Sequence, residues 1–198
     1  MKILIDNGHG FNTPGKCSPD GQYKEWAFAR EIAQMIADEL TSRGYDAQRI
    51  VTETADIDLS ERARRVNEIC GKVGTGNVIL VSIHSNASGN GQWMAARGWS
   101  AFTSKGKTKA DELATAIYKE AEKNFIGHKI RTDYSDGDPD WEEGFYILRK
   151  TKCPAVLTEN FFHDNREDVA YITSAEGKRA IVRTHVDGII NYIKAQGR

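Results

Sequence analysis

Two histidines and two glutamates, His9, Glu25, His84 and Glu159, are of the types needed to hold and use a catalytic metal ion. Two imidazoles and one carboxylate form a known ligand set for catalytic zinc, which leaves a fourth coordination position for water. Such a centre keeps net positive charge, so it can acidify its water and polarise a carbonyl oxygen. A second carboxylate nearby can move the proton of that water, which predicts hydrolysis. This chemistry favours zinc, although iron and manganese accept the same donors.

These residues are too far apart in the chain to form a local motif, so the fold must bring them together. Both histidines and Glu159 follow short apolar runs, at residues 3–5, 78–83 and 155–158. Unbroken apolar runs are typical of strands that are buried on both faces of a parallel sheet. The carboxyl ends of parallel strands share one edge, where open α/β sheets bind ligands. We therefore predict that these three side chains meet at that edge.

Glu25 stands at the predicted start of a helix over residues 25–43. The apolar residues of this segment recur every three or four positions, and they are Phe28, Ile32, Met35, Ile36 and Leu40. This spacing predicts one apolar stripe that faces the sheet. A right-handed crossover from the first strand returns the start of the helix to the same edge. Glu25 is therefore expected beside the other three candidates.

Strand and helix patterns alternate along the rest of the chain. We predict further strands at residues 45–51, 98–103 and 145–148, and further helices at residues 58–70, 107–124, 164–171 and 173–194. This alternation predicts one α/β domain over residues 1–198, with a largely parallel central sheet and helices on both faces.

The composition excludes several classes of protein. The 198 residues carry a formal net charge of −1 and are 39% apolar, so charge predicts no nucleic-acid partner. No stretch approaches the ~20 apolar residues needed for membrane insertion. The three cysteines are widely spaced and form neither a disulfide framework nor a metal motif. The first strand begins without a signal-peptide pattern, so we expect synthesis in the cytoplasm, and we expect a monomer.

Each candidate residue also has an ordinary interpretation. His9 could be a turn histidine that bonds only to the backbone, and Glu25 could be a first-turn glutamate favoured by the helix dipole. Glu159 could be a fourth ligand, or a salt-bridge partner of Arg149 or Lys152. The catalytic interpretation therefore depends on whether the four side chains converge.

The other histidines and several tryptophans are expected to have ordinary structural roles. His128 falls in a polar loop and is expected to be solvated. His163 is expected at the surface, with a role at the rim of the site as the less common alternative. His185 fits the inward side of the last helix and is expected to be structural. Trp93, Trp99 and Trp141 could stack on sugar rings, although packing is the commoner role of an aromatic side chain.

Several segments, in order, resemble the zinc-dependent N-acetylmuramoyl-L-alanine amidases. The family comprises the catalytic domain of bacterial cell-separation amidases and many phage lytic enzymes. The resemblance covers nearly the whole chain, and it is carried by residues 3–10, Glu25, residues 59–62 with Asn67, residues 82–87 and residues 155–162 with Asn165.

The resemblance implies a function for each candidate residue. His9, Glu25 and His84 would bind one catalytic zinc ion, and Glu159 would be the catalytic glutamate. The implied substrate is the amide that joins the lactyl group of N-acetylmuramic acid to L-alanine in peptidoglycan. The implied place of action is the cell wall, after release from the cytoplasm as with phage endolysins. A zinc peptidase of the stem peptide and a non-catalytic wall-binding module on the same fold are the alternatives.

The chain also departs from the family pattern at two places. Asn7 stands where a proline is usual before the Gly-His pair, and both residues suit a turn. Asn160-Phe161-Phe162 replaces the commoner small residue followed by Gly-Phe after the glutamate. None of the four candidate site residues is substituted.

Overall fold

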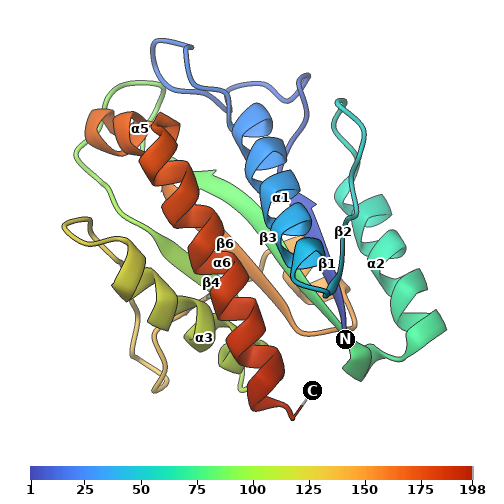
Figure 1. Ribbon diagram of the computed structural model, residues 1–198. Helices are drawn as coiled ribbons and strands as arrows, with labels where there is room; N and C mark the ends of the chain where they lie inside the picture. The colour runs from blue at the N-terminus through green and yellow to red at the C-terminus, as the bar shows by residue number, and fades with distance from the viewer. Residues whose placement is uncertain (198) are drawn as a thin grey trace.

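The computed structural model describes residues 1–197 and contains one six-stranded sheet (Figure 1). The strands are β1 (Lys2–Asn7), β2 (Asp46–Arg49), β3 (Val78–Asn86), β4 (Ser100–Thr103), β5 (Trp141–Glu142) and β6 (Ala155–Phe162). Across the sheet their order is β2-β1-β3-β6-β4-β5. β1 pairs in parallel with β2 and β3, and β3 pairs in parallel with β6, whereas β4 is antiparallel to β6. The predicted α/β class with a largely parallel sheet is confirmed.

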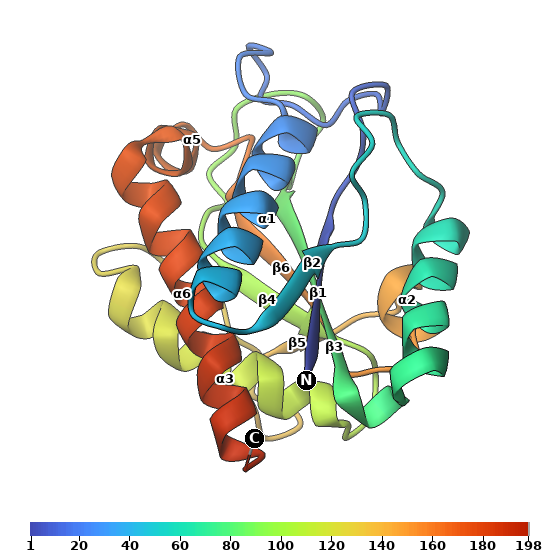
Figure 2. The same cartoon turned by 45° about the vertical axis from the view of Figure 1, so that its right-hand side comes forward.

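Helices cover both faces of this sheet. They are α1 (Glu25–Ser42), α2 (Leu59–Val73), α3 (Lys109–Asn124), α4 (Tyr146–Lys150), α5 (Arg166–Thr173) and α6 (Ala175–Ala195), with a 3₁₀ turn at Thr75–Asn77. α1, α6 and α3 lie side by side on the face toward the viewer in Figure 1, and α5 packs against α6. α2 and α4 pack together on the opposite face, as Figure 2 shows.

Coverage of both faces explains the unbroken apolar runs of the inner strands. Ile3, Leu4 and Ile5 of β1 have no exposed surface. Ile3 and Ile5 belong to the core beneath α1, α3 and α6, whereas Leu4 belongs to the core beneath α2 and α4. Each residue of such a strand therefore contacts a hydrophobic core, whichever face it points to.

The start of α1 agrees with the predicted helix. Its stripe of Phe28, Ile32, Ile36 and Leu40 is buried against the sheet. The helix begins at Glu25, whose side chain reaches the backbone N–H of Ser85 at the carboxyl end of β3. The crossover from β1 therefore returns the first turn of α1 to the expected edge.

The predicted strand at residues 145–148 is wrong. These residues lie at the start of α4, for which Phe145 is the N-cap. A run of four apolar residues is compatible with a strand or with a short helix. Here the edge of β6 is already paired with β4, and the segment forms a helix. Ile147 and Leu148 instead pack into the core beneath α2. The predicted strand at residues 155–158 is correct but short, since β6 continues to Phe162.

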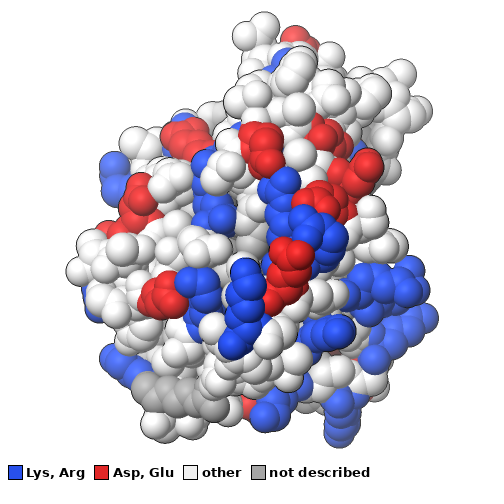
Figure 3. Space-filling model, turned by 90° about the vertical axis from the view of Figure 1, so that its right-hand side faces the viewer, with Lys and Arg blue, Asp and Glu red and all other residues white. Residues whose placement is uncertain are grey.

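Two further observations concern the surface of the molecule. No helix within residues 1–197 has both the length and the apolar character to cross a membrane. Over α2, basic and acidic side chains lie side by side (Figure 3), and Arg65 forms ion pairs with Glu53 and Glu61 there. Ion pairs therefore offset part of the positive charge of this helix.

Candidate active site

His9 lies in the turn after β1, in a backbone conformation that few non-glycine residues adopt. Its φ is 60°, a left-handed value that costs free energy for a residue with a side chain. Arg30 Nη1 of α1 donates to the His9 carbonyl oxygen at 2.8 Å, and Arg62 Nη2 of α2 donates to it at 3.3 Å. These bonds from two helices hold the turn, so the position of the His9 imidazole is fixed by the fold.

The Glu25 carboxylate is the centre of the cluster and is 1% exposed. Its Oε1 lies 3.3 Å from His9 Nε2 and 3.1 Å from His84 Nδ1, and it accepts a hydrogen bond from Ser85 N at 3.1 Å. Burial by itself would raise the pKa of Glu25, but hydrogen bonds with His84 and His9 outweigh it and lower that pKa. The group is therefore an ionised, buried carboxylate.

The geometry of these three residues fits a divalent cation. One potential ligand atom from each of His9, Glu25 and His84 lies within 4.8 Å of the other two. Glu25 Oε2 is buried and has no hydrogen-bond partner within residues 1–197, which an anion in the protein interior rarely tolerates without a cation. Two imidazoles and a carboxylate are the donors that zinc takes in catalytic sites. The structure therefore brings the three predicted ligands together as a candidate metal site.

Glu159 lies beside this cluster on the neighbouring strand. It is opposite His84 in the parallel pairing of β3 with β6, so both side chains point to the same face. Burial raises the pKa of Glu159 and the Glu25 charge adds to this, whereas His84 opposes it. Glu159 Oε2 is buried without a hydrogen-bond partner in the described chain, and Glu159 forms no ion pair there with Arg149 or Lys152. The salt-bridge interpretation is therefore not supported.

A cavity of about 390 Å³ opens over these residues. Its lining includes His9, His84 and Glu159 and residues at the starts of α2 and α4. The apolar lining residues are Ile57, Leu59, Phe145, Ile147 and Leu157, and the other charged ones are Asp6, Lys16, Asp56, Asp58 and Arg62. In Figure 2 the loops that follow β1 and β3 gather at this end of the sheet. The cavity therefore combines polar groups that can act on an amide with apolar side chains that can hold a substrate.

The expectation that His163 lies at the surface is wrong, because the residue is only 3% exposed. His163 Nδ1 lies 3.3 Å from Ser85 Oγ and 3.8 Å from Glu25 Oε2. The Tyr23 hydroxyl donates a hydrogen bond to Ser85 Oγ at 2.8 Å. Tyr23, Ser85 and His163 therefore form a buried polar group next to the Glu25 carboxylate. Burial lowers the pKa of His163. Partners of this kind orient a ligand, and the only signal in the sequence was the nearness of His163 to Glu159.

His128, His185, Trp93 and Trp99 make contacts outside the cluster, and Trp99 is fully buried in the core beneath α3 and α6. His128 is not simply solvated, because its ring stacks on Tyr171 at 3.7 Å between centroids. His185 is buried as predicted, and its Nε2 lies 2.9 Å from Thr158 Oγ1. Trp93 is covered on one side by the Arg166 guanidinium, 4.3 Å from the centroid of the ring.

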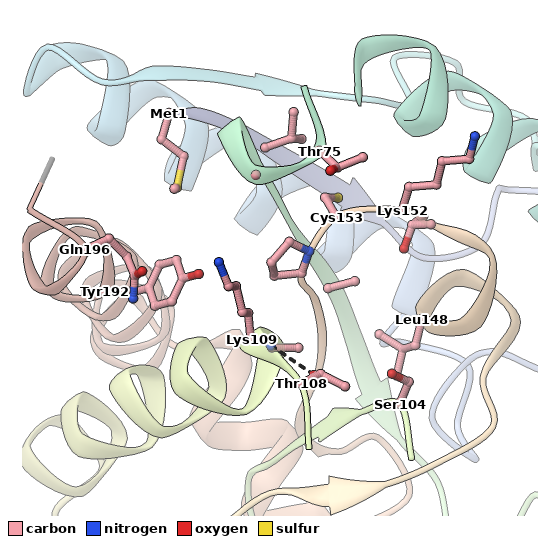
Figure 4. Close-up of a pocket in the computed structure, with 16 residues that line it drawn as sticks. Met1, Thr75, Ser104, Thr108, Lys109, Leu148, Lys152, Cys153, Tyr192 and Gln196 are labelled. Carbon is pink, nitrogen blue, oxygen red and sulfur yellow. Dashed lines mark hydrogen bonds between the residues drawn. The ribbon is translucent and has the colours of Figure 1, made fainter. Parts of the chain in front are cut away.

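A second cavity, of about 410 Å³, lies at the other end of the sheet (Figure 4). It is lined by Val78 and Ala155, the first residues of β3 and β6, and by Lys109, Cys153 and Tyr192. Because β3 and β6 are parallel, this position is a full strand length from His84 and Glu159. No histidine or carboxylate is among its lining residues, so it lacks the groups for metal-assisted hydrolysis.

Residues 3–191 match the family model of the N-acetylmuramoyl-L-alanine amidases. The chain is 28% identical to the endolysin of Bacillus phage SPP1 over 195 residues, which cover 96% of this chain and 65% of the endolysin. It is 26% identical to the N-acetylmuramoyl-L-alanine amidase CwlM of Bacillus licheniformis over 196 residues, which cover 96% and 67% of the two chains. The chain thus spans about two thirds of the length of these relatives.

A solved structure has the same architecture. The N-acetylmuramoyl-L-alanine amidase from Clostridium difficile 630 is similar to this chain with a TM-score of 0.81 and 28% sequence identity. The similarity covers 99% of this chain and 98% of that one. The whole α/β fold is therefore shared, including the sheet edge that carries the candidate site.

Proposed function

Because this chain belongs to the N-acetylmuramoyl-L-alanine amidase family, we propose that it is a zinc-dependent hydrolase of the amide between N-acetylmuramic acid and L-alanine in peptidoglycan. The observation that carries this proposal is the convergence of three ligand-type atoms within 4.8 Å, with Glu159 directly across the β3–β6 ladder from His84. Residues 1–198 would form one catalytic domain that acts as a monomer on the cell wall.

His9, Glu25 and His84 would hold the zinc ion. Bound there, zinc would supply a Lewis acid that acidifies a water molecule and polarises the scissile carbonyl. Glu25 contributes the negative charge, and the Ser85 N–H holds its carboxylate by a hydrogen bond to Oε1. His163 Nδ1 lies 3.8 Å from the other carboxylate oxygen, Oε2. The fixed turn at His9 sets the position of the first imidazole.

Glu159 would carry the proton. Its buried Oε2 is free of other partners in the described chain, so it can accept a proton from the attacking water and give it to the departing L-alanine nitrogen. Burial holds the pKa of this carboxyl above its usual range, and a base with a raised pKa is a better proton acceptor near neutrality. Phe145 and Leu157 place apolar surface in the same cavity, where it can contact the substrate.

Replacement of Glu159 by glutamine tests this assignment. Glu159→Gln keeps the shape of the side chain but removes the base, so hydrolysis of purified peptidoglycan should fall at least ~100-fold. The zinc content of the protein should stay near that of wild type, because Glu159 is not one of the three proposed ligands. Glu122→Gln, on the exposed side of α3, is the matched control and should retain both activity and zinc.

The products distinguish this reaction from the alternatives. An amidase releases a free lactyl carboxylate on N-acetylmuramic acid and a new amino terminus on L-alanine. A zinc peptidase would instead create amino termini within the stem peptide, and a non-catalytic binding module would leave peptidoglycan intact in a zymogram. Wild-type turnover by Glu159→Gln, or peptidase products from the wild type, would contradict the proposal.

A further inference from the structure

A row of side chains crosses the sheet from the candidate metal site toward β5. His84 of β3 is opposite Glu159 of β6, and Glu159 is opposite Ser100 of β4. Opposite residues in a ladder point to the same face. Leu157 and Phe102, two positions away on β6 and β4, pack in the core beneath α2 and α4. The row therefore lies on that face, where the cavity opens.

Arg131 extends this row by one more position. Its backbone N–H donates to the Trp99 carbonyl oxygen at 2.8 Å, and Trp99 pairs with Ile130 in a parallel bridge. Trp99 and Ile130 belong to the core beneath α3 and α6. Since side chains alternate along extended backbone, Arg131 points to the opposite face. Its side chain therefore shares a face with Ser100 and Glu159.

Aromatic rings, and no acidic groups, hold the Arg131 guanidinium. Its Cζ lies 5.3 Å from the centroid of the Trp141 ring and 5.1 Å from that of Phe162. The guanidinium makes no hydrogen bond or ion pair with any residue in the range 1–197. Burial raises the pKa of Glu159, and the charges of His84, Lys16 and, most weakly, Arg131 oppose that rise. An unpaired cation thus lies within electrostatic reach of the proposed base.

The side-chain hydrogen-bond donors of Arg131 are free to bind a ligand, unlike those of Arg62. Arg62 is 1% exposed and uses its donors within the protein, on Asp6 and on backbone carbonyl oxygens. Arg131 is half-buried and keeps its donors free. Rings on two sides fix the orientation of its planar fork and reduce its hydration. A fork held in this way is prepared for a two-point hydrogen bond to a carboxylate.

We propose that Arg131 binds a carboxylate of the peptide stem, on the residue that follows the L-alanine. This inference rests on the proposed amidase function. Two strand spacings put the Arg131 backbone about 10 Å from that of Glu159, and an extended peptide advances about 3.5 Å per residue. The Arg131 guanidinium leans back over Phe162 of β6 and so shortens this distance. We therefore place the bound carboxylate one residue beyond the cleaved amide. D-Glutamate with a free α-carboxylate fits this position, whereas its α-carboxamide lacks the charge.

Two soluble substrates that differ in one group test this selection. They are N-acetylmuramyl-L-alanyl-γ-D-glutamyl-L-lysine and the same molecule with its α-carboxyl amidated. Charged hydrogen bonds of this kind correspond to roughly a tenfold to hundredfold preference. We expect the wild type to favour the acid by that ratio in kcat/KM, mainly through KM. In Arg131→Met the ratio should fall to about one, and Arg131→Lys should be intermediate because a point charge lacks the fork.

Direct binding separates this inference from the catalytic proposal. Calorimetry with L-alanyl-γ-D-glutamyl-L-lysine and its α-amide should show the same preference in zinc-loaded Glu159→Gln, and its loss when Arg131→Met is added. Arg183→Met, on the exposed side of α6, is the control and should keep the wild-type ratio. Equal use of both peptides by the wild type, or a ratio that survives Arg131→Met in a folded protein, would overturn the assignment. Hydrolysis of neither substrate together with selective binding would overturn the amidase proposal and support the carboxylate site.

Discussion

At the scale of single residues, Gly8 lacks a side chain where the His84 imidazole, a proposed zinc ligand, packs against the backbone. A Cβ built on Gly8 would lie 2.3 Å from His84 Cε1 and 2.5 Å from His84 Nδ1, closer than any real contact. Gly8→Ala should therefore displace the His84 imidazole and weaken zinc binding by about 10- to 100-fold. Competition with a chromogenic chelator measures this affinity. Gly71→Ala, where a Cβ meets nothing within 4 Å, should bind zinc like the wild type, and equal affinities for the two variants would refute the steric explanation.

Phe161 shows two residue-scale effects that oppose each other. Its φ is 68°, a value that favours glycine, yet its ring is fully buried and lies 5.1 Å from the ring of Phe125 and 5.2 Å from that of Tyr171. Relief of the backbone strain is worth about 1–2 kcal/mol, whereas loss of a buried phenyl ring costs about 3–5 kcal/mol. Phe161→Gly should therefore lower the free energy of unfolding by about 2–3 kcal/mol, as measured in urea.

A second variant separates the two effects at this position. Phe161→Ala removes the ring but keeps the left-handed strain, so it should be about 1 kcal/mol less stable than Phe161→Gly. If Phe161→Gly matched or exceeded the wild type, strain would outweigh packing. The glycine that is common in the family at this position would then be the more stable choice for this chain as well.

At the scale of elements, Arg62 joins the first turn of α2 to the end of β1. It is almost fully buried, and its Nη1 donates to Asp6 Oδ1 and to the Asn7 carbonyl oxygen, both at 2.6 Å. Asp6 in turn accepts a hydrogen bond from Ser82 Oγ of β3 at 2.6 Å. One guanidinium thereby couples α2, β1 and β3 directly beneath the turn that carries His9.

Loss of this guanidinium should therefore be costly. Arg62→Met leaves the Asp6 carboxylate buried without its cation, so the free energy of unfolding should fall by about 3–5 kcal/mol. The double variant with Arg62→Met and Asp6→Asn should lose less free energy of unfolding than the two single variants lose together. The reason is that Asp6→Asn removes the buried carboxylate that Arg62→Met leaves unpaired. The exposed Arg64 pairs with Glu61 at the surface, and Arg64→Met should cost below about 1 kcal/mol. Equal losses for Arg62→Met and Arg64→Met would contradict this account.

At the scale of the whole molecule, the metal should stabilise the fold, because its ligands come from three separate elements. His9 follows β1, Glu25 starts α1 and His84 lies on β3, so unfolding disperses them. With free zinc at 100 times Kd, binding adds about 2.7 kcal/mol, and for a chain of this size removal should lower Tm by about 5–10 °C. Calorimetry with and without EDTA measures the change. His84→Ala should melt alike in both conditions, and a wild-type Tm that does not move on complete zinc removal would contradict the assigned ligands.

The sequence by itself determined the parts of this protein that depend on local pattern. The apolar runs at residues 3–5 and 78–83 predicted inner strands, because a strand that is buried on both faces shows no alternation of polar and apolar residues. The helical stripe predicted α1 and placed Glu25 at its start. Parallel strands share one carboxyl edge, so His9, His84 and Glu159 could be expected together before any contact was known.

Only the tertiary structure decided the features that depend on pairing between distant segments. Residues 145–148 form the start of α4 because the edge of β6 is already taken by the antiparallel β4. His163 is buried because Tyr23 and Ser85, remote in the chain, close over it. The face to which Arg131 points follows from a bridge to Trp99. No local periodicity encodes such choices, since they are set by which strand edges remain open once the rest of the chain has folded.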